Sequence, residues 1–315
     1  MGGDLAEEKS VNYRAAIDIG TNTVLLLVAD KTRDHITPIY EAQLLPRLGK
    51  GVDTNRNIST KAAGRVGGAV QSHLEDIQQR FGEIPVRITA TSAVRDARNR
   101  DEVLRQLYDS TGYPVQLLSG AEEAELTFRG ALSMVNQHSE NPVVVDIGGG
   151  STEVISGQGS RIRAAHSWDI GCVRFTERYL PEMPASKTQI EACRQGVLDG
   201  LGQGGPDFSG FSTELIGVAG TVTSLAALHQ KLPGYDASRI NGYRLTLEEI
   251  EKFMKWATSL TRQELEQLNP EVMNGRSDIM SAGLVILTEM MNFWGFQTLQ
   301  VSTGGLRHGV ILEGD

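Results

Sequence analysis

The chain has 315 residues, which suits two domains better than one hydrophobic core, and 40% of the residues are hydrophobic and 22% charged, as in ordinary globular proteins. The formal net charge of −9 argues against general binding of nucleic acid polymers. Residues 1–10 are polar and acidic, so we expect no signal peptide and a cytoplasmic location. No apolar run approaches the roughly 18 residues of a membrane span. Cys172 and Cys193 stand apart and are expected to be buried thiols.

The first elements in chain order are strands and one long helix. Residues 13–30 read as strand, turn and strand, because apolar residues flank the segment Asp18-Ile19-Gly20-Thr21-Asn22-Thr23. Residues 39–48 look extended. A helix is predicted over residues 59–81, where apolar residues recur on one face and Gly82 stops it.

A strand predicted at residues 85–91 leads into Arg95. This arginine could aim its guanidinium at a ligand, or it could be one more surface arginine. The next turn, after a short strand at residues 115–118, opens a helix with Ser119 and Glu122 three residues apart, which is the spacing of a capping box. Glu123 then points about 100° away around the helix and is free for chemistry. The alternative is that Glu123 only complements the helix dipole in an acidic first turn.

The most informative stretch is residues 142–153. Val143-Val144-Val145 read as a buried strand, and Asp146-Ile147-Gly148-Gly149-Gly150-Ser151-Thr152-Glu153 follow. Bare glycine N–H groups can converge on an anion, and a carboxylate on each side suits a divalent cation. The alternative is a plain β-hairpin with a glycine-rich turn. The same Asp-Ile-Gly pattern occurs at Asp18, which we interpret as a weak internal repeat.

Two further glycine turns follow strands, around Gly220 and Gly304, and a long apolar helix is predicted over residues 277–294. In an α/β fold with two related halves, four such turns gather at strand ends and line the cleft between the halves. No P-loop, dinucleotide or Ser-His-Asp pattern is present. The chemistry that these turns suit is phosphate binding at several points.

These residues resemble the exopolyphosphatase/guanosine pentaphosphate phosphohydrolase (Ppx/GppA) family, within the actin, sugar kinase and heat-shock chaperone superfamily. The resemblance covers nearly the whole chain. It rests on six segments in the family's order: Ala16 to Thr23, Ala90 to Arg95, Leu118 to Ala124, Val145 to Glu153, Asp169 to Phe175, and Gly217 to Thr221.

The resemblance implies an α/β fold of two ribonuclease-H-like domains with an interdomain cleft, over residues 1–124 and 125–315, the last helix being able to pack back on the first domain. It implies that Glu123 is the catalytic base, which deprotonates the attacking water. It implies metal-binding roles for Asp146 and Glu153, with Asp18 as a weaker candidate, and the metal would be Mg²⁺ or another divalent cation. The implied phosphate-binding residues are Thr21, Asn22, Arg95, Gly148, Gly149, Gly150, Ser151, Gly220 and Thr221.

The expected substrate is inorganic polyphosphate, with guanosine pentaphosphate as the close alternative. A small-molecule kinase and a nucleotide-binding scaffold are the more distant alternatives on the same fold. The chain resembles short two-domain members of the family, so strong processivity on long chains is not expected. A homodimer could form through the apolar residues Met290, Met291, Phe293 and Trp294, which suit a core equally well. A basic groove could be formed by Arg129, Arg161, Arg163, Arg174, Arg178, Arg239 and Arg244.

Overall fold

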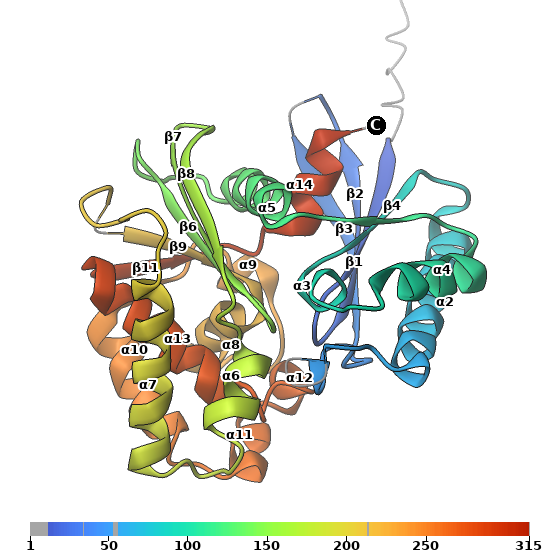
Figure 1. The fold of residues 1–315 in the computed structure, drawn as a ribbon. Coiled ribbons are helices and arrows are strands. Elements are labelled where there is room, and N and C mark those ends of the chain that lie inside the picture. Colours follow the sequence, from blue (N-terminus) through green and yellow to red (C-terminus); the bar gives the residue numbers. More distant parts are fainter. Residues whose placement is uncertain (1–11, 34, 53–55, 213, 315) are drawn as a thin grey trace, which may run out of the picture.

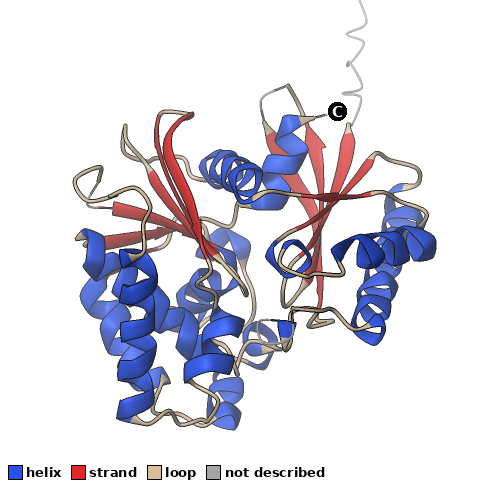
Figure 2. Cartoon of the chain, in the orientation of Figure 1, coloured by secondary structure: helices blue, strands red, loops and turns tan. Residues whose placement is uncertain are grey.

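The computed structural model describes residues 12–33, 35–52, 56–212 and 214–314, which form two β-sheets with helices packed against them (Figures 1 and 2). The first sheet has the strand order β3-β2-β1-β4-β5. Its central strand β1 pairs antiparallel with β2 and parallel with β4. The strands are β1 (Tyr13–Ile19), β2 (Val24–Lys31), β3 (Ile36–Leu44), β4 (Val86–Ala90) and β5 (Val115–Leu117).

The second sheet repeats this plan, with the order β10-β11-β9-β6-β7-β8. Its central strand β6 pairs antiparallel with β7 and parallel with β9, and β10 is an added edge strand. The predicted α/β fold of two ribonuclease-H-like units is therefore confirmed. Asp18 and Asp146 occupy equivalent places, each as the next-to-last residue of its central strand. The strands are β6 (Val143–Ile147), β7 (Thr152–Gln158), β8 (Arg161–Trp168), β9 (Glu214–Val218), β10 (Arg244–Thr246) and β11 (Thr298–Val301).

The first sheet carries three helices on one face. The predicted long helix is α2 (Thr60–Phe81), and the side chain of Ser59 caps it by accepting a hydrogen bond from the N–H of Ala62. The helices α3 (Ser92–Arg95) and α4 (Arg100–Thr111) follow β4. The extended segment predicted at residues 39–48 is β3, which begins and ends a few residues earlier than predicted.

The second sheet is covered by a larger helical layer (Figure 2). Its central helix α13 (Met280–Trp294) is apolar on nearly every side and packs against α7 and α10. Met290, Met291 and Trp294 lie in this core, whereas Phe293 is 46% exposed. The other helices are α6 (Cys172–Tyr179), α7 (Lys187–Gly202), α8 (Ala219–His229), α9 (Ala237–Ile240), α10 (Leu247–Ala257), α11 (Arg262–Leu268) and α12 (Pro270–Met273).

Two helices join the halves of the molecule, α5 (Gly120–Met134) and α14 (Leu306–Glu313), and they lie side by side between the sheets (Figure 1). The predicted domain boundary, between residues 124 and 125, falls within α5. The last helix, α14, returns to the first sheet, where Val310 and Ile311 pack against residues of β1 and β2. The crossing is close, because a Cβ at Gly130 would lie 1.9 Å from the carbonyl oxygen of Gly305. Only glycine fits there.

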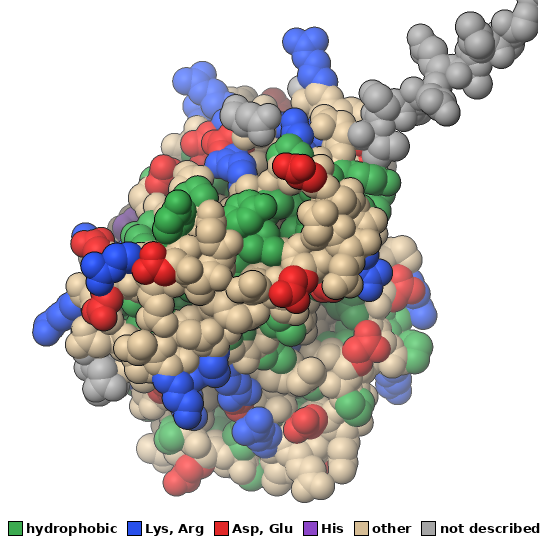
Figure 3. Space-filling model, turned by 90° about the vertical axis from the view of Figure 1, so that its right-hand side faces the viewer, with side chains coloured by type: hydrophobic (Ala, Val, Ile, Leu, Met, Phe, Trp, Pro, Cys, Tyr) green, Lys and Arg blue, Asp and Glu red, His purple; other side chains and the backbone are tan. Residues whose placement is uncertain are grey.

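The surface agrees with the ordinary composition of the chain. Acidic and basic side chains are interspersed on the face of the first half that Figure 3 shows. A helix long and apolar enough to cross a membrane does not occur among the described residues. Cys172 and Cys193 are buried and form no disulfide, as the sequence predicts.

Candidate active site

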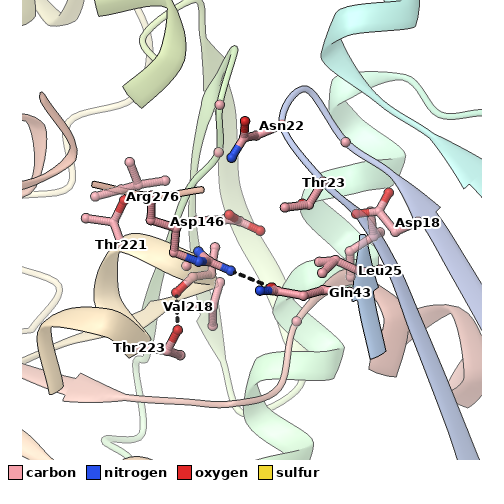
Figure 4. Close-up of a pocket in the computed structure, with 18 of the residues that line it drawn as sticks. Asp18, Asn22, Thr23, Leu25, Gln43, Asp146, Val218, Thr221, Thr223 and Arg276 are labelled. Carbon is pink, nitrogen blue, oxygen red and sulfur yellow. Dashed lines mark hydrogen bonds between the residues drawn. The ribbon is translucent and has the colours of Figure 1, made fainter. Parts of the chain in front are cut away.

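A cleft of about 520 Å³ lies between the two sheets, and the four predicted turns meet in it. Gly20 comes from the turn after β1, Gly148 from the turn after β6, Gly220 from the start of α8, and Gly304 from the segment before α14. Figure 4 shows Asp18 and Asp146 approaching the cleft from its two sides. The cleft is therefore built from the positions that the sequence marked for phosphate binding.

The turns after β1 and β6 have the same hydrogen bond. The N–H of Gly20 donates to the carbonyl of Thr23 at 2.9 Å, and the N–H of Gly148 donates to the carbonyl of Ser151 at 3.0 Å. Each turn thus reverses the chain over four residues directly after an aspartate. The internal repeat predicted from the two Asp-Ile-Gly segments extends to this backbone geometry.

The turn over residues 148–151, called the phosphate loop below, has its backbone oriented by helix α6. The carbonyl of Gly148 accepts from the N–H of Cys172, and the carbonyl of Gly149 accepts from the N–H of Val173, both at 2.9 Å. A trans peptide points its N–H opposite to its C=O. The N–H groups of Gly149 and Gly150 therefore face away from α6, and among the described residues they have no backbone acceptor. Backbone N–H groups left without an acceptor in such a turn can bind an anion.

Glu123 lies beside this loop, in the first turn of α5. The predicted capping box is confirmed, since Glu122 Oε2 accepts from both the N–H and the hydroxyl of Ser119. Glu123 is free of the cap, only 7% exposed, and its Oε2 accepts from Arg95 Nη1 at 2.8 Å. Burial raises the pKa of Glu123 above its usual 4.5, although Arg95 opposes the shift. A carboxylate with a raised pKa is a better proton acceptor at neutral pH.

Arg95 is held by this pair and by a second bond from Nη1 to the carbonyl of Leu118. It lies next to the candidate base rather than on the wall of the cleft. Gly150 and Glu153 also lie behind that wall, whereas every other predicted site residue lines the cleft. The structure therefore brings the predicted residues together in two layers, one that lines the cleft and one, formed by Arg95, Gly150 and Glu153, directly behind it.

The carboxylates form an unusual acidic group. Burial raises the pKa of Asp18 and of Asp146 to about 7, and the negative charge of Glu123 adds to both shifts. Burial likewise raises the pKa of Glu153, whose Oε1 accepts from the hydroxyl of Ser167 at 2.5 Å. The Oδ1 atom of Asp18 is buried, and it has no hydrogen-bond partner in the described part of the chain. A cation would relieve this repulsion and fits the oxygen donors present.

The protein side chains alone do not complete a metal site. Within the described ranges, no three His, Cys, Asp or Glu side chains converge closely enough to hold an ion. Mg²⁺ commonly keeps several waters and binds through one or two carboxylates together with phosphate oxygens. Asp146 and Asp18 fit that mode of binding.

The remaining predicted residues lie on both sides of the cleft. The hydroxyls of Thr21 and Ser92 are 3.1 Å apart, and Asn22 Nδ2 donates to the carbonyl of Gly275 across the cleft at 3.1 Å. Gly220 and Thr221 open α8 after Ala219, whose φ of 66° is rare for a residue with a side chain. Strained backbone of this kind is concentrated at functional sites.

Arg276 is a site residue that the sequence analysis missed. Its Nη2 donates to Gln43 Oε1 at 3.0 Å (Figure 4). Its Nη1 lies over Gly220, where an added Cβ would be only 1.1 Å away. Burial lowers the pKa of Arg276, but an arginine stays protonated at neutral pH. This guanidinium and the N-terminus of α8 both attract an anion at the same place. The available signal was a Gly-Arg pair just before an apolar helix.

His308 lines the cleft and makes the stability of the protein depend on pH. Burial lowers its pKa from 6.5 to about 3, and the nearby positive charge of Arg307 adds to the shift. Below pH 6.5 the unfolded chain therefore takes up a proton that the folded protein does not, so stability falls as the pH falls. Between pH 6.5 and 4.5 we expect the free energy of unfolding of the wild type to fall by about 2–3 kcal/mol more than that of His308→Met, at about 1.4 kcal/mol per pH unit. Urea unfolding at the two pH values measures this difference.

The matched control for this prediction is His138→Met, because the ring of His138 is exposed. The control is expected to follow the pH dependence of the wild type. A His308→Met variant that also follows the wild type would contradict the assignment of acid sensitivity to His308.

The chain is similar to known proteins over nearly its whole length. The family model for the Ppx/GppA phosphatase family matches residues 27–314. The chain is 34% identical to Exopolyphosphatase 2 of Mycobacterium tuberculosis, covering 95% of this chain and 97% of that protein. The crystal structure of an exopolyphosphatase from Cytophaga hutchinsonii superposes with a TM-score of 0.84 at 26% identity, covering 96% of this chain and 98% of that one. A Ppx/GppA family member from Aquifex aeolicus gives 0.79 at 25% identity, with 96% and 97% covered. The chain belongs to the Ppx/GppA phosphatase family, a family of phosphoanhydride hydrolases.

Proposed function

We propose that this protein releases the terminal phosphate of inorganic polyphosphate in a reaction that depends on a divalent cation. The observation that carries the proposal is the position of Glu123, a buried carboxylate with a raised pKa, in the same cleft as Gly148, Gly149 and Ser151 of the phosphate loop. The similarity to Exopolyphosphatase 2 supports the choice of polyphosphate.

In this mechanism the phosphate loop holds the terminal phosphate through the N–H groups of Gly149, Gly150 and Ser151. Glu123 accepts a proton from a water molecule while the water oxygen attacks the terminal phosphorus. The bond from that phosphorus to the bridging oxygen breaks, and the shortened chain leaves with the bridging oxygen. Since phosphoryl transfer depends on positioning and on neutralising charge, these residues supply most of what the reaction needs.

The proposed cation is Mg²⁺, which when bound neutralises phosphate charge. Asp146 and Asp18, which line the cleft, are the proposed protein ligands, assisted by water and phosphate oxygens. Glu153, behind the cleft wall, is proposed to act near the ion through its negative charge. Thr21 and Asn22 belong to the turn after β1, across the cleft from the phosphate loop, where they would contact the terminal phosphate. Arg276, Gly220 and Thr221 would contact the phosphates that follow it.

Guanosine pentaphosphate is the second candidate substrate, and one observation favours it. Tyr235 lines the cleft near Arg276, so an aromatic ring lies close to the guanidinium that is proposed to contact the inner phosphates. A nucleobase can stack on both kinds of group. A polyphosphate chain would gain nothing from the aromatic ring.

The direct test measures phosphate release from polyphosphate and from guanosine pentaphosphate under the same conditions. We expect polyphosphate to be hydrolysed with the higher kcat/KM. A higher value for guanosine pentaphosphate would replace the first candidate by the second. Phosphoryl transfer from ATP to an acceptor, or assembly on ATP without phosphate release, would instead favour a kinase or a scaffold protein.

Removal of divalent cations is expected to abolish activity. Protein treated with EDTA and then freed of the chelator should release phosphate at least about 10² times more slowly, because charge neutralisation is worth several kcal/mol in such reactions. Addition of MgCl₂ should restore the rate. Full activity after chelation, with metal content verified by elemental analysis, would sink the cation dependence.

The cytoplasmic location and the homodimer also stay predictions. The first agrees with the two free, buried thiols. The second now depends mainly on Phe293, because its apolar neighbours Met290, Met291 and Trp294 are buried in the core.

A further inference from the structure

Arg174 is a buried arginine directly behind the phosphate loop. Its side chain is 6% exposed, although the sequence analysis placed it among candidates for a basic groove. Arg174 belongs to the first turn of α6, and its Nε donates to the carbonyl of Gly150 at 2.8 Å. Its Nη2 donates to Asp96 Oδ2 at 2.7 Å and lies 3.6 Å from Asp169 Oδ1. Arg174 is therefore not part of an exposed groove.

The bond to Gly150 completes the orientation of the loop. The N–H groups of Cys172 and Val173 hold the first two loop carbonyls, and the N–H of Arg174 also goes to the carbonyl of Gly149, at 3.1 Å. The third carbonyl, that of Gly150, is held by the Arg174 side chain. Since a trans peptide points its two polar groups in opposite directions, this bond turns the N–H of Ser151 toward the cleft.

Asp96 brings the other half of the molecule into the same arrangement. It follows α3 directly, next to Arg95, and Arg95 pairs with Glu123 at 2.8 Å. The loop of the second half and the glutamate of α5 are thus connected through two adjacent residues of the first half. The connection runs from Gly150 through Arg174 to Asp96, and from Arg95 to Glu123.

We propose that Arg174, held by Asp96, is a positioning residue that orients the Ser151 N–H and sets the phosphate loop relative to Glu123. The inference rests on the proposed hydrolysis. A purely structural ion pair is the competing explanation, because a buried pair that loses one partner destabilises a protein wherever it lies. The two explanations differ in what they predict for kcat and for phosphate binding.

The experiment compares Arg174→Gln, Asp96→Asn and the double variant by steady-state kinetics on polyphosphate. We expect Arg174→Gln to lower kcat about 10- to 100-fold with a smaller change in KM, somewhat less than the loss of a whole anion-hole donor. Asp96→Asn should lower kcat about tenfold. The double variant should be no slower than Arg174→Gln, because residues that act as one unit are not additive.

Two further variants separate positioning from stability. Arg174→Lys keeps a positive charge beside Asp96 and so preserves folding, and we expect it to lose about tenfold in kcat, since an ammonium lacks the planar fork of a guanidinium. Arg194→Gln is the matched control, because Arg194 Nε pairs at 2.8 Å with the buried carboxylate of Glu289 between α7 and α13, outside the cleft. The control is expected to lower the melting temperature and to leave kcat unchanged.

A readout independent of turnover is the rise in melting temperature caused by inorganic phosphate. We expect a smaller rise in Arg174→Gln than in wild type. Equal rises in both proteins, including no rise in either, would overturn the proposal. A kcat of Arg174→Gln equal to that of wild type would also overturn it. The same holds if the kcat losses of the two single variants multiply in the double variant, or if Arg194→Gln loses as much kcat as Arg174→Gln. If wild type hydrolyses neither substrate, the proposed function fails and the phosphate series alone decides the role of Arg174.

Discussion

Glu123→Gln is expected to lower kcat for phosphate release by about 10²- to 10⁴-fold, the usual effect of removing a general base. The amide has nearly the same shape as the carboxylate and can still accept from Arg95, but it cannot take a proton from water. The substitution removes the negative charge that pairs with Arg95, but Arg95 keeps its hydrogen bond to the carbonyl of Leu118 and can donate to the amide oxygen at position 123. The fold should therefore be retained. Steady-state kinetics on polyphosphate together with circular dichroism provide the measurement.

The neighbouring residue supplies the control for this prediction. Glu122 belongs to the same helical turn, is exposed, and serves only the capping box with Ser119. Glu122→Gln should keep nearly full activity and lose at most about 1 kcal/mol of stability, since glutamine also completes a capping box. Wild-type activity in Glu123→Gln, or equal losses in the two variants, would remove Glu123 from the mechanism.

Gly171→Ala is expected to lower kcat about 10²-fold, although Gly171 takes no direct part in the proposed reaction. A Cβ at Gly171 would lie 2.4 Å from the carbonyl oxygen of Gly149 and 2.5 Å from the carbonyl carbon of Gly150. The φ of −141° is open to any residue, so the cause is lack of space and not backbone strain. The phosphate loop would have to move away from α6. A displacement of about 1 Å at a reacting centre can cost about 10² in rate.

The control is Gly68→Ala, on the exposed side of α2, where an added Cβ meets no atom within 4 Å. This variant should keep its activity and gain up to about 1 kcal/mol of helix stability. Comparison of kcat and of melting temperature for the two variants tests the prediction. An active Gly171→Ala protein would show that contact between α6 and the loop is not needed for catalysis.

The local part of the site could be predicted from the sequence because it depends on short-range rules. The capping box at Ser119 and Glu122 fixes how the first turn of α5 is oriented, and that alone separates Glu123 from its neighbour. The two Asp-Ile-Gly segments likewise predict equivalent strands, because a turn of this kind needs only its own few residues.

Long-range partners could not be predicted in this way. Arg276 reaches Gln43 across 233 residues of sequence, and the pairing depends on how two sheets are placed. Arginine is usually exposed, but Arg174 is buried, because the carbonyl of Gly150 and the carboxylate of Asp96 accept hydrogen bonds from its guanidinium. The hydrophobic pattern of one segment does not indicate which hydrogen-bond acceptors a distant segment will place beside it.

The return of α14 to the first sheet has a consequence for how the protein is made. Val310 and Ile311 cover apolar residues of β1 and β2, among them Ala16 and Leu27, which leave the ribosome nearly 300 residues earlier. Synthesis at about 5–20 residues per second leaves that face without α14 for about 15–60 s. The first half of the chain must therefore wait, with an apolar surface open to chaperones, until residues 306–313 have been translated.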